Sequence, residues 1–356
     1  MIPLISSGKS QKITSNRRKA VTMRDIAEDA HVSITTVSHV VNHTATISDA
    51  TAERVRCSIR KLGYKPLPSA EFNRGQRLIA VFIPDLRNEF YAKSVQAIFD
   101  AAWQHDYGIV VCDLKHSHQA ESQYLRNLLH QNICGIIFFG GISDLEQQIR
   151  NISKKVPVVL GDMQLPKGFP KSVDAICSNN DQIMCSTITR LARAGYTKIG
   201  YISEDFLLTN SRDRFNGYKE GLEKNGLPYQ KQWVFISERL RLNKIDSSYH
   251  FFSAILQHGI VLPQILLCSS DLIAIGIIGA LKKHGYHIPR DIGVIGFDDI
   301  SVAPYVDPPL TTVAQNMEQM GSRCFACLLN RIEHPERPPQ EIAIRSKLII
   351  RNSVKL

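Results

Sequence analysis

The sequence has no long apolar runs. No segment approaches the roughly 20 apolar residues of a membrane-spanning helix, and residues 1–20 contain no apolar core of the length that a signal peptide needs. These two absences argue against a membrane protein and predict a cytoplasmic location.

The motifs of common enzymes are missing as well. There is no serine elbow, no G-x-G-x-x-G fingerprint and no metalloprotease helix. Cys324 and Cys327 form a lone C-x-x-C, without the second pair that would complete four tetrahedral zinc ligands. The eight cysteines are scattered through apolar segments, which is typical of reduced core residues. We therefore expect no catalytic residue, no metal and no cofactor; a sugar-processing enzyme stays as a rival that turnover of a substrate would reveal.

Acidic residues are absent from the first 20 positions. That segment carries Lys9, Lys12, Arg17, Arg18 and Lys19, and the whole chain has a formal net charge of +10. An acid-free basic arm favours attraction to the phosphates of a nucleic acid. A basic tail that is merely solvated is the alternative.

Residues 21–42 predict a helix, a tight turn and a second helix. Ile26, Ala27 and Ala30 form one apolar stripe, and the valines of the second segment form another at helical spacing. Ser33 stands where an N-cap belongs. The second helix leaves these side chains facing outward: Ile34, Thr35, Thr36, Ser38, His39 and Asn42. Such residues can meet base edges and phosphates in a major groove, although short amphipathic helix pairs also begin ordinary globular domains.

The rest of the chain divides into three parts. A third helix over 51–62 completes a small all-α headpiece at 21–66, and residues 67–77 are polar, contain Pro68 and Gly75, and predict a linker. From 78 to 356, apolar runs alternate with helical stretches, which indicates parallel sheets covered on both faces in two doubly wound lobes. Acids and hydroxyls end several of these strands, as at Asp162 and Asp271, and would suit a small polyhydroxylated molecule in a cleft between the lobes.

Two sets of segments resemble a known family. MRDIAEDAHVSITTVSHVVN (23–42) and LGYKP (62–66) look like the headpiece of the lactose-repressor (LacI/GalR) family of bacterial transcription regulators. RDRFNGYKEGLEKNG (212–226) and the segment from CSSDLIAIG to DPPLTTVAQ (268–315) resemble its periplasmic-binding-protein-like core. The resemblance implies a first lobe of about 78–174 plus 315–344 and a second of about 175–314 plus 345–356. The DPPLTTVAQ ending is most similar to the cytidine-repressor branch.

The resemblance also implies site residues. Base readers fall on Ile34, Thr35 and His39, with supporting contacts from Thr22, Ser33, Thr36, Ser38 and Asn42. Effector-binding positions fall on Phe90, Tyr91, Asp162, Arg214, Arg239 and Asp298, to which we add the strand-end Asp271. Arg239 departs from the family, because some members carry a stacking aromatic residue there; the cation leaves room for an acidic or phosphorylated effector.

The linker is shorter than in many members of the family, which insert a leucine into the minor groove from a short hinge helix. Phe72 is the only large apolar residue in 69–74. Either Phe72 acts as such a wedge, or the linker is a flexible tether. Phe72→Ala separates the two, because only the loss of a wedge would weaken operator binding and remove a DNA bend.

The predicted protein is a DNA-binding transcription repressor that binds operator DNA as a homodimer or higher oligomer. A small effector (a sugar, a nucleoside or a sugar phosphate) bound between the lobes would control its DNA affinity. A small-molecule-binding protein of the same fold without a DNA role is the alternative.

Overall fold

The computed structural model describes residues 21–42, 47–64, 77–115, 124, 133–140, 146–165 and 168–356. The chain divides into two compact units, Met1–Gly75 and Gln76–Leu356. The basic arm at 1–20 and Phe72 lie outside the described residues, as does the side chain of Asn42. No helix in the described part of the chain is long and apolar enough to cross a membrane.

The described part of the first unit contains three helices, α1 (Met23–Ala30), α2 (Ile34–Asn42) and α3 (Asp49–Leu62). Thr22 and Asp25 cap the start of α1 reciprocally, and Ser33 Oγ accepts the amide proton of Thr36 at 3.0 Å, which confirms the predicted cap of α2. The two helices can turn sharply because His31 adopts a left-handed conformation with φ 52°. A small apolar core, with Ile26 and Val55 fully buried, holds the three helices together.

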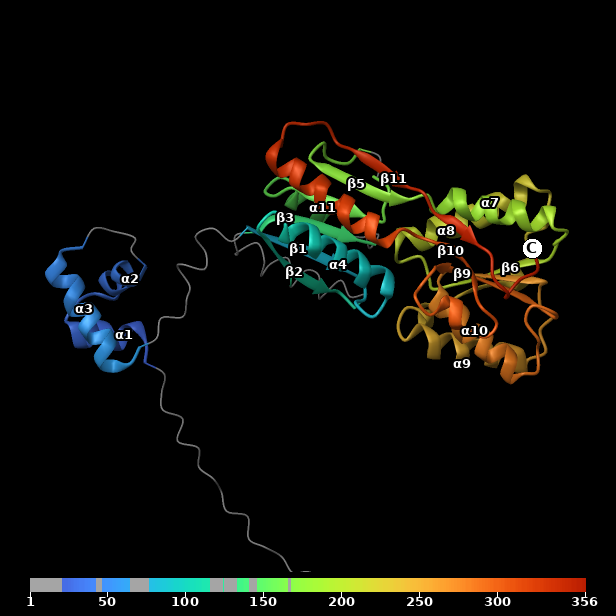
Figure 1. Cartoon of the computed structure of the whole chain (residues 1–356), viewed down its shortest axis with the longest axis horizontal. Helices are drawn as coiled ribbons and strands as arrows, with labels where there is room; N and C mark the ends of the chain where they lie inside the picture. Colours follow the sequence, from blue (N-terminus) through green and yellow to red (C-terminus); the bar gives the residue numbers. More distant parts are fainter. Residues whose placement is uncertain are drawn as a thin grey trace, which may run out of the picture. The chain divides into compact units, whose positions relative to one another are not determined.

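The second unit contains two six-stranded sheets (Figure 1). The first sheet is entirely parallel, with the strand order β11-β5-β4-β3-β1-β2. Its strands are β1 (Arg77–Ile83), β2 (Tyr107–Asp113), β3 (Ile133–Phe139), β4 (Val158–Gly161), β5 (Val173–Ser178) and β11 (Glu341–Ile344). The second sheet has the order β12-β10-β9-β8-β6-β7 and is parallel except for β12. Its strands are β6 (Ile199–Ser203), β7 (Val234–Ile236), β8 (Ile265–Cys268), β9 (Gly293–Asp298), β10 (Thr311–Ala314) and β12 (Lys347–Ile349).

Each sheet forms one lobe with its covering helices. Figure 1 shows α4 and α11 over the first sheet, and α7 and α8 on the opposite side of the second sheet from α9 and α10. The helix bounds are α4 (Glu89–Trp103), α6 (Glu146–Ile152), α7 (Asn180–Arg193), α8 (Thr209–Lys224), α9 (Lys244–Gln257), α10 (Asp271–Lys283) and α11 (Met317–Glu333). Short 3-10 turns lie at Lys231–Trp233, Glu238–Leu240 and Ala303–Tyr305. The described elements thus form the two lobes that the alternating pattern predicts.

The chain crosses between the lobes three times, after β5, after β10 and after β11. The first crossing falls after Ser178, a few residues later than the predicted boundary at 174. The reason is that the chain does not leave the first sheet at Asp174 but continues there as β5. The buried carboxylate of Asp174 is tolerated inside this strand because Arg331 and Arg337 neutralise it.

Candidate functional site

The exposed side of α2 presents the predicted DNA-contact residues. Ile34 is 46% exposed, Ser33 and Thr35 are exposed, and His39 is half-buried, while Val37 is fully buried beneath them. The hydroxyls of Ser33 and Thr36 lie 2.8 Å apart. A small helix with hydroxyls, an imidazole and one exposed isoleucine on its outer side can enter a major groove.

Two features of this unit escaped the sequence analysis. The Thr22 hydroxyl donates to the Asp25 carboxylate and accepts from the Asp25 amide, so the side chain of Thr22 serves first as a helix cap. Arg24 and Arg54 are exposed and have no ion-pair partner among the described residues, which leaves them free for phosphates. In the sequence, nothing marks these two arginines as phosphate contacts except that each is a cation close to the start of a predicted helix.

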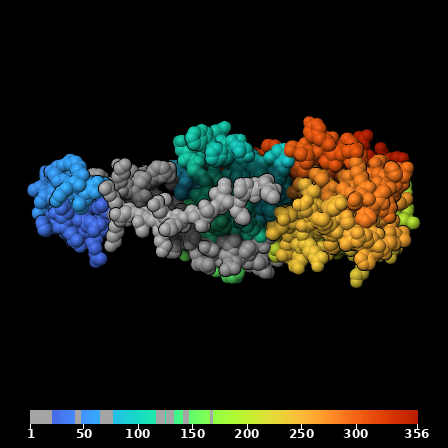
Figure 2. Space-filling model, turned by 90° about the horizontal axis from the view of Figure 1, so that it is seen from below, coloured from blue at the N-terminus to red at the C-terminus, as the bar shows by residue number. Residues whose placement is uncertain are grey.

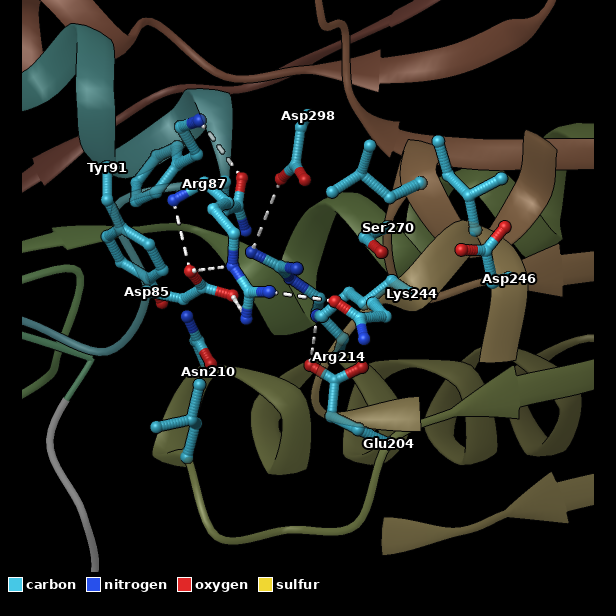
Figure 3. A pocket seen from close by; sticks show the side chains of 16 residues that line it. Asp85, Arg87, Tyr91, Glu204, Asn210, Arg214, Lys244, Asp246, Ser270 and Asp298 are labelled. Carbon is cyan, nitrogen blue, oxygen red and sulfur yellow. Dashed lines mark hydrogen bonds and ion pairs between the residues drawn. The ribbon is translucent and has the colours of Figure 1, made fainter. Parts of the chain in front are cut away.

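The second unit contains a cavity of about 320 Å³ between the lobes (Figure 3). It lies where the carboxyl ends of β1, β6, β8 and β9 converge, as expected for ligand sites of open parallel sheets. Its lining residues are Asp85, Arg87, Asn88, Phe90 and Tyr91 from the first lobe and Glu204, Leu208, Asn210, Arg214, Asn243, Lys244, Ile245, Asp246, Ser270, Leu272 and Asp298 from the second.

Arg214 lies at the centre of this cavity. Its Nε donates to Asn180 Oδ1 at 3.0 Å and its Nη1 to the carbonyl oxygen of Ser269 at 2.7 Å. Its Nη2 lies 4.0 Å from Asp162 Oδ2 and 3.9 Å from Asp298 Oδ1, beyond hydrogen-bond distance of both. One guanidinium edge is therefore fixed by the protein while the other nitrogen is left to donate to a ligand.

Asp162 and Asp298 approach Arg214 from opposite lobes. Both have positive φ angles, 54° and 119°, a conformation that residues with side chains rarely adopt and that gathers at functional sites. Asp162 Oδ2 accepts from Asn210 at 2.5 Å, but its Oδ1 has no partner among the described residues. Burial raises the pKa of Asp298 to about 6 although Arg214 opposes the shift, and burial also raises the pKa of Asp162.

Asp298 is connected to two of the lobe crossings. Its Oδ1 accepts from Gln315, which follows β10, and Gln315 in turn accepts from Ser178 at the end of β5, both at 2.8 Å. A change at the cavity carboxylate can therefore reach both crossings through two hydrogen bonds.

The first turn of α4 supplies the aromatic wall. Phe90 and Tyr91 line the cavity, and their rings meet edge to face with centroids 5.2 Å apart. The hydrogen bond from the Phe90 amide to Asn88 Oδ1 caps the helix and fixes this turn. A flat or ring-shaped ligand would find apolar surface here. The role of the two residues in effector binding stays a prediction.

Three predicted effector residues, Asp162, Asp271 and Arg239, are not among the residues that line this cavity. Asp271 is buried at the start of α10, where it accepts from Thr312 Oγ1 at 2.5 Å and from the Ile300 amide at 2.9 Å. It therefore ties α10 to the end of β9 and to β10. Arg239 lines a separate hollow with His250 and His258. Because Arg239 does not replace an aromatic residue inside the cavity, it gives no support for an acidic or phosphorylated effector.

Lys244 is a cavity residue that the sequence analysis missed. Its Nζ donates to Glu204 Oε1 at 3.0 Å, and both side chains are almost fully buried. Burial alone would raise the pKa of Glu204, but Lys244, backbone hydrogen bonding and Ser269 outweigh it and lower the pKa to about 2. The start of α9 can lie here because Gly276 of α10 has no Cβ, which would meet Ser248 Oγ at 2.0 Å.

Several hydrogen bonds hold the lobes against each other. Arg87 Nη1 of the first lobe donates to Asn243 Oδ1 of the second at 2.7 Å. The carboxylate of Glu89 accepts from both the amide and the hydroxyl of Ser301, each at 2.8 Å. Figure 2 shows the first lobe, in teal, against the second, in yellow to red, on one face. The lobes thus contact each other directly, an arrangement that we call closed.

Fold and site together define a class: a helix-turn-helix unit followed by a two-lobed binding core. Residues 22–67 match the family described as bacterial regulatory proteins, lacI family, and residues 188–354 match the periplasmic binding protein-like domain. The chain belongs to the lacI family of bacterial regulatory proteins.

Named relatives cover almost the whole chain. The HTH-type transcriptional repressor PurR of Vibrio vulnificus (strain CMCP6) is 26% identical over 344 residues, which are 94% of this chain and 98% of the relative. The ribose operon repressor of Haemophilus influenzae (strain ATCC 51907 / DSM 11121 / KW20 / Rd) is 26% identical over 340 residues, with 94% and 98% covered. These relatives are transcriptional repressors. The assignment to the cytidine-repressor branch stays a prediction.

Solved structures agree over the same length. A complex of the transcriptional regulator CelR with cellobiose has a TM-score of 0.68 at 26% identity and covers 94% of this chain and 99% of that one. The Lac repressor bound to ONPG in its repressed state has a TM-score of 0.69 at 25% identity and covers 94% and 100%.

Proposed function

We propose that this protein is a transcription repressor that binds operator DNA through α2 and whose DNA affinity is set by a small sugar- or nucleoside-like effector. The observation that carries the proposal is one chain with both a lacI-type headpiece and a cavity walled by two lobes. It acts in the cytoplasm, and it is not an enzyme.

The regulation rests on the closed arrangement of the lobes. Phe90 and Tyr91 come from one lobe and Arg214 and Asp298 from the other, so an effector that contacts both sets binds the closed form more tightly than an open one. The Asp298–Gln315–Ser178 hydrogen bonds offer a path to the lobe crossings. Operator binding changes if only one lobe arrangement holds two headpieces at the half-site spacing.

We place the homodimer interface on α4 and β2. Phe99 and Trp103 are 49% and 74% exposed and their rings stack with centroids 6.4 Å apart. Val111, 39% exposed, lies on β2, which ends the first sheet. Exposed aromatic and aliphatic side chains that gather on one face are typical of protein interfaces.

The first test of the DNA surface is His39→Ala. The full chain and the variant each select sites from a random DNA library. Because an imidazole that reads a base edge discriminates by about 1–3 kcal/mol, the variant should lose its preference at one symmetric position by about 5- to 150-fold. Binding to random DNA is the control; an equal loss on operator and random DNA would refute the role of His39.

Effector binding should weaken below about pH 6. A ligand hydroxyl donates best to an ionised carboxylate, and Asp298, with a pKa raised to about 6 by burial, takes up a proton as the pH falls through that value. One coupled proton lowers affinity by up to about tenfold per pH unit. Titrations at pH 7.5, 6 and 5 measure this, and Asp298→Asn should bind weakly at all three. A dissociation constant that stays constant from pH 7.5 to 5 argues against an ionised Asp298 as acceptor.

The same group has the opposite effect on folding. Its pKa is about 6 in the folded chain against 3.8 unperturbed, so the folded state binds more protons between these values. Its contribution to the free energy of unfolding is therefore fully present below about pH 4 and is lost as the pH rises through about 6.

A further inference from the structure

Two of the cations that line the effector cavity, Arg87 and Lys244, are already paired with carboxylates of the protein. Arg87, at its mouth, makes a two-pronged contact with Asp85: Nε lies 2.9 Å from Oδ1 and Nη2 lies 3.0 Å from Oδ2. Its remaining Nη1 donates to Asn243. A guanidinium with all three nitrogens engaged has little left to offer an incoming anion.

Lys244 is neutralised in a more buried place. Glu204 accepts from Lys244 at 3.0 Å and also from Ser211 at 2.9 Å and Ser269 at 2.8 Å. The carboxylate is held by three donors from different elements, so it does not swing away to release the ammonium group. Because both charges are screened from water, separating them is costly.

Arg214 faces more negative than positive charge. Its Nη2 lies 4.0 Å from Asp162 Oδ2 and 3.9 Å from Asp298 Oδ1. Figure 3 marks the ion pair with Asp298. Asp246, at the start of α9, lines the same cavity and has no ion-pair partner among the described residues. Among the described residues that line the cavity, three cations therefore face four carboxylates: Arg87, Arg214 and Lys244 against Asp85, Glu204, Asp246 and Asp298. The buried Asp162 adds a further carboxylate beside Arg214.

From this balance we propose that the cavity selects an effector without an anionic group and discriminates against the phosphate ester of the same compound. This rests on the proposed function and names the chemical class of its effector. The ligand is rich in hydroxyl or amino donors, which meet the carboxylates of Asp298 and Asp246, while its acceptors meet the uncommitted Nη2 of Arg214. A phosphate would lose its water and would meet the Nη2 of Arg214 only beside the carboxylates of Asp162 and Asp298, whose negative charge repels it.

The cavity volume agrees with this class. About 320 Å³ accommodates a nucleoside or a small saccharide, and the wall of Phe90 and Tyr91 offers apolar surface to a ring. Glu204 is then a specificity-determining residue, because its ion pair with Lys244 keeps the ammonium group from binding an anionic ligand. Glu204→Gln keeps the size of the side chain and one acceptor oxygen but removes the negative charge, which leaves the ammonium group of Lys244 uncompensated.

The test uses the full chain and two matched pairs of probes: cytidine with cytidine 5′-monophosphate, and ribose with ribose 5-phosphate. Titration calorimetry should show the uncharged member of a pair binding at least 100-fold more tightly than its phosphate. In Glu204→Gln this ratio should fall at least tenfold. Glu220→Gln, which removes an exposed carboxylate from α8 that pairs with Lys224, should leave the ratio unchanged.

Inorganic phosphate gives an answer even if neither parent compound binds. It should not raise the melting temperature of the wild-type chain and should raise that of Glu204→Gln. Phosphate protection of the wild type that Lys244→Gln abolishes would overturn the proposal. So would a phosphate ester that binds as tightly as its parent, or a Glu204→Gln variant with neither an altered ratio nor phosphate protection.

Operator binding of the same preparations separates this proposal from the proposed function. If the uncharged probe binds selectively but never changes operator affinity, the charge selectivity stands and the regulatory role fails. If a phosphate ester binds selectively and changes operator affinity, the regulatory role stands and the charge selectivity fails.

Discussion

Replacing Arg214 by alanine is expected to weaken effector binding by about 30-fold to a few thousand-fold. Arg214 donates to Asn180 and Ser269 and faces Asp162 and Asp298, and its guanidinium carbon lies 3.8 Å from the centroid of the Phe297 ring. Truncating one member of a buried, hydrogen-bonded charge cluster at a binding site costs about 2–5 kcal/mol, and each 1.4 kcal/mol is tenfold. Calorimetric titration of the effector measures the change.

Operator binding in the absence of effector should stay within about twofold, since Arg214 belongs to the core unit. Arg212→Ala is the matched control: it removes an exposed arginine two positions away on α8, whose contact is the carbonyl oxygen of Phe206. An Arg214→Ala variant that still responds at the wild-type effector concentration would make Arg214 a purely structural residue.

The second large effect concerns stability. Asp174→Asn should lower the free energy of unfolding of the core by about 3–5 kcal/mol, because Arg331 and Arg337 would remain buried without their counter-charge. Each arginine contacts both oxygens of Asp174, at 2.8–3.1 Å, and the Gln340 amide donates to Oδ1 at 2.7 Å. The cluster joins the end of α11 to the segment that leads into β11.

Thermal unfolding of the full chain checks this prediction. For a core of this size we expect a fall of about 6–20 °C in the melting temperature of the core transition. Asp205→Asn, at a partly exposed pair with Arg241, should shift it far less, because ion pairs near water contribute little. A shift as small as that of Asp205→Asn would mean that the Asp174 cluster does not stabilise the core.

The parts of the fold that could be predicted are those with a continuous apolar signal. The runs that become β1, β3 and β8, for example, contain no polar side chain apart from Arg77 at the start of β1, because buried parallel strands are covered on both faces. The apolar pattern does not reveal β5, because Asp174 interrupts it. It does not reveal β10 either, because that strand begins with Thr311 and Thr312.

Those polar side chains are tolerated because their partners come from remote parts of the chain. Thr312 donates to Asp271 and Asp174 binds Arg331, across 41 and 157 positions of sequence. A local pattern contains no trace of such pairs.

The residues of the candidate site likewise divide into those that the sequence indicated and those that it could not indicate. Acids at strand ends were visible in the sequence, and Asp162 and Asp298 both lie about 4 Å from Arg214. The sequence alone could not distinguish these two acids from Asp271. Asp271 also follows a strand, but its carboxylate accepts hydrogen bonds from Thr312 and the Ile300 amide. Lys244 begins a helix whose position depends on the close approach of Gly276, so nothing local marked it as a cavity residue.

The central claim is that effector and operator binding are coupled, and one measurement tests it in both directions. Fluorescence anisotropy gives the dissociation constant of labelled operator with and without saturating effector, and calorimetry gives that of the effector with and without operator. Coupling of about 1–3 kcal/mol predicts that both constants change by the same factor, between about 5- and 150-fold. If effector binds the core and operator binds the headpiece while neither constant moves, the protein is not an effector-controlled repressor.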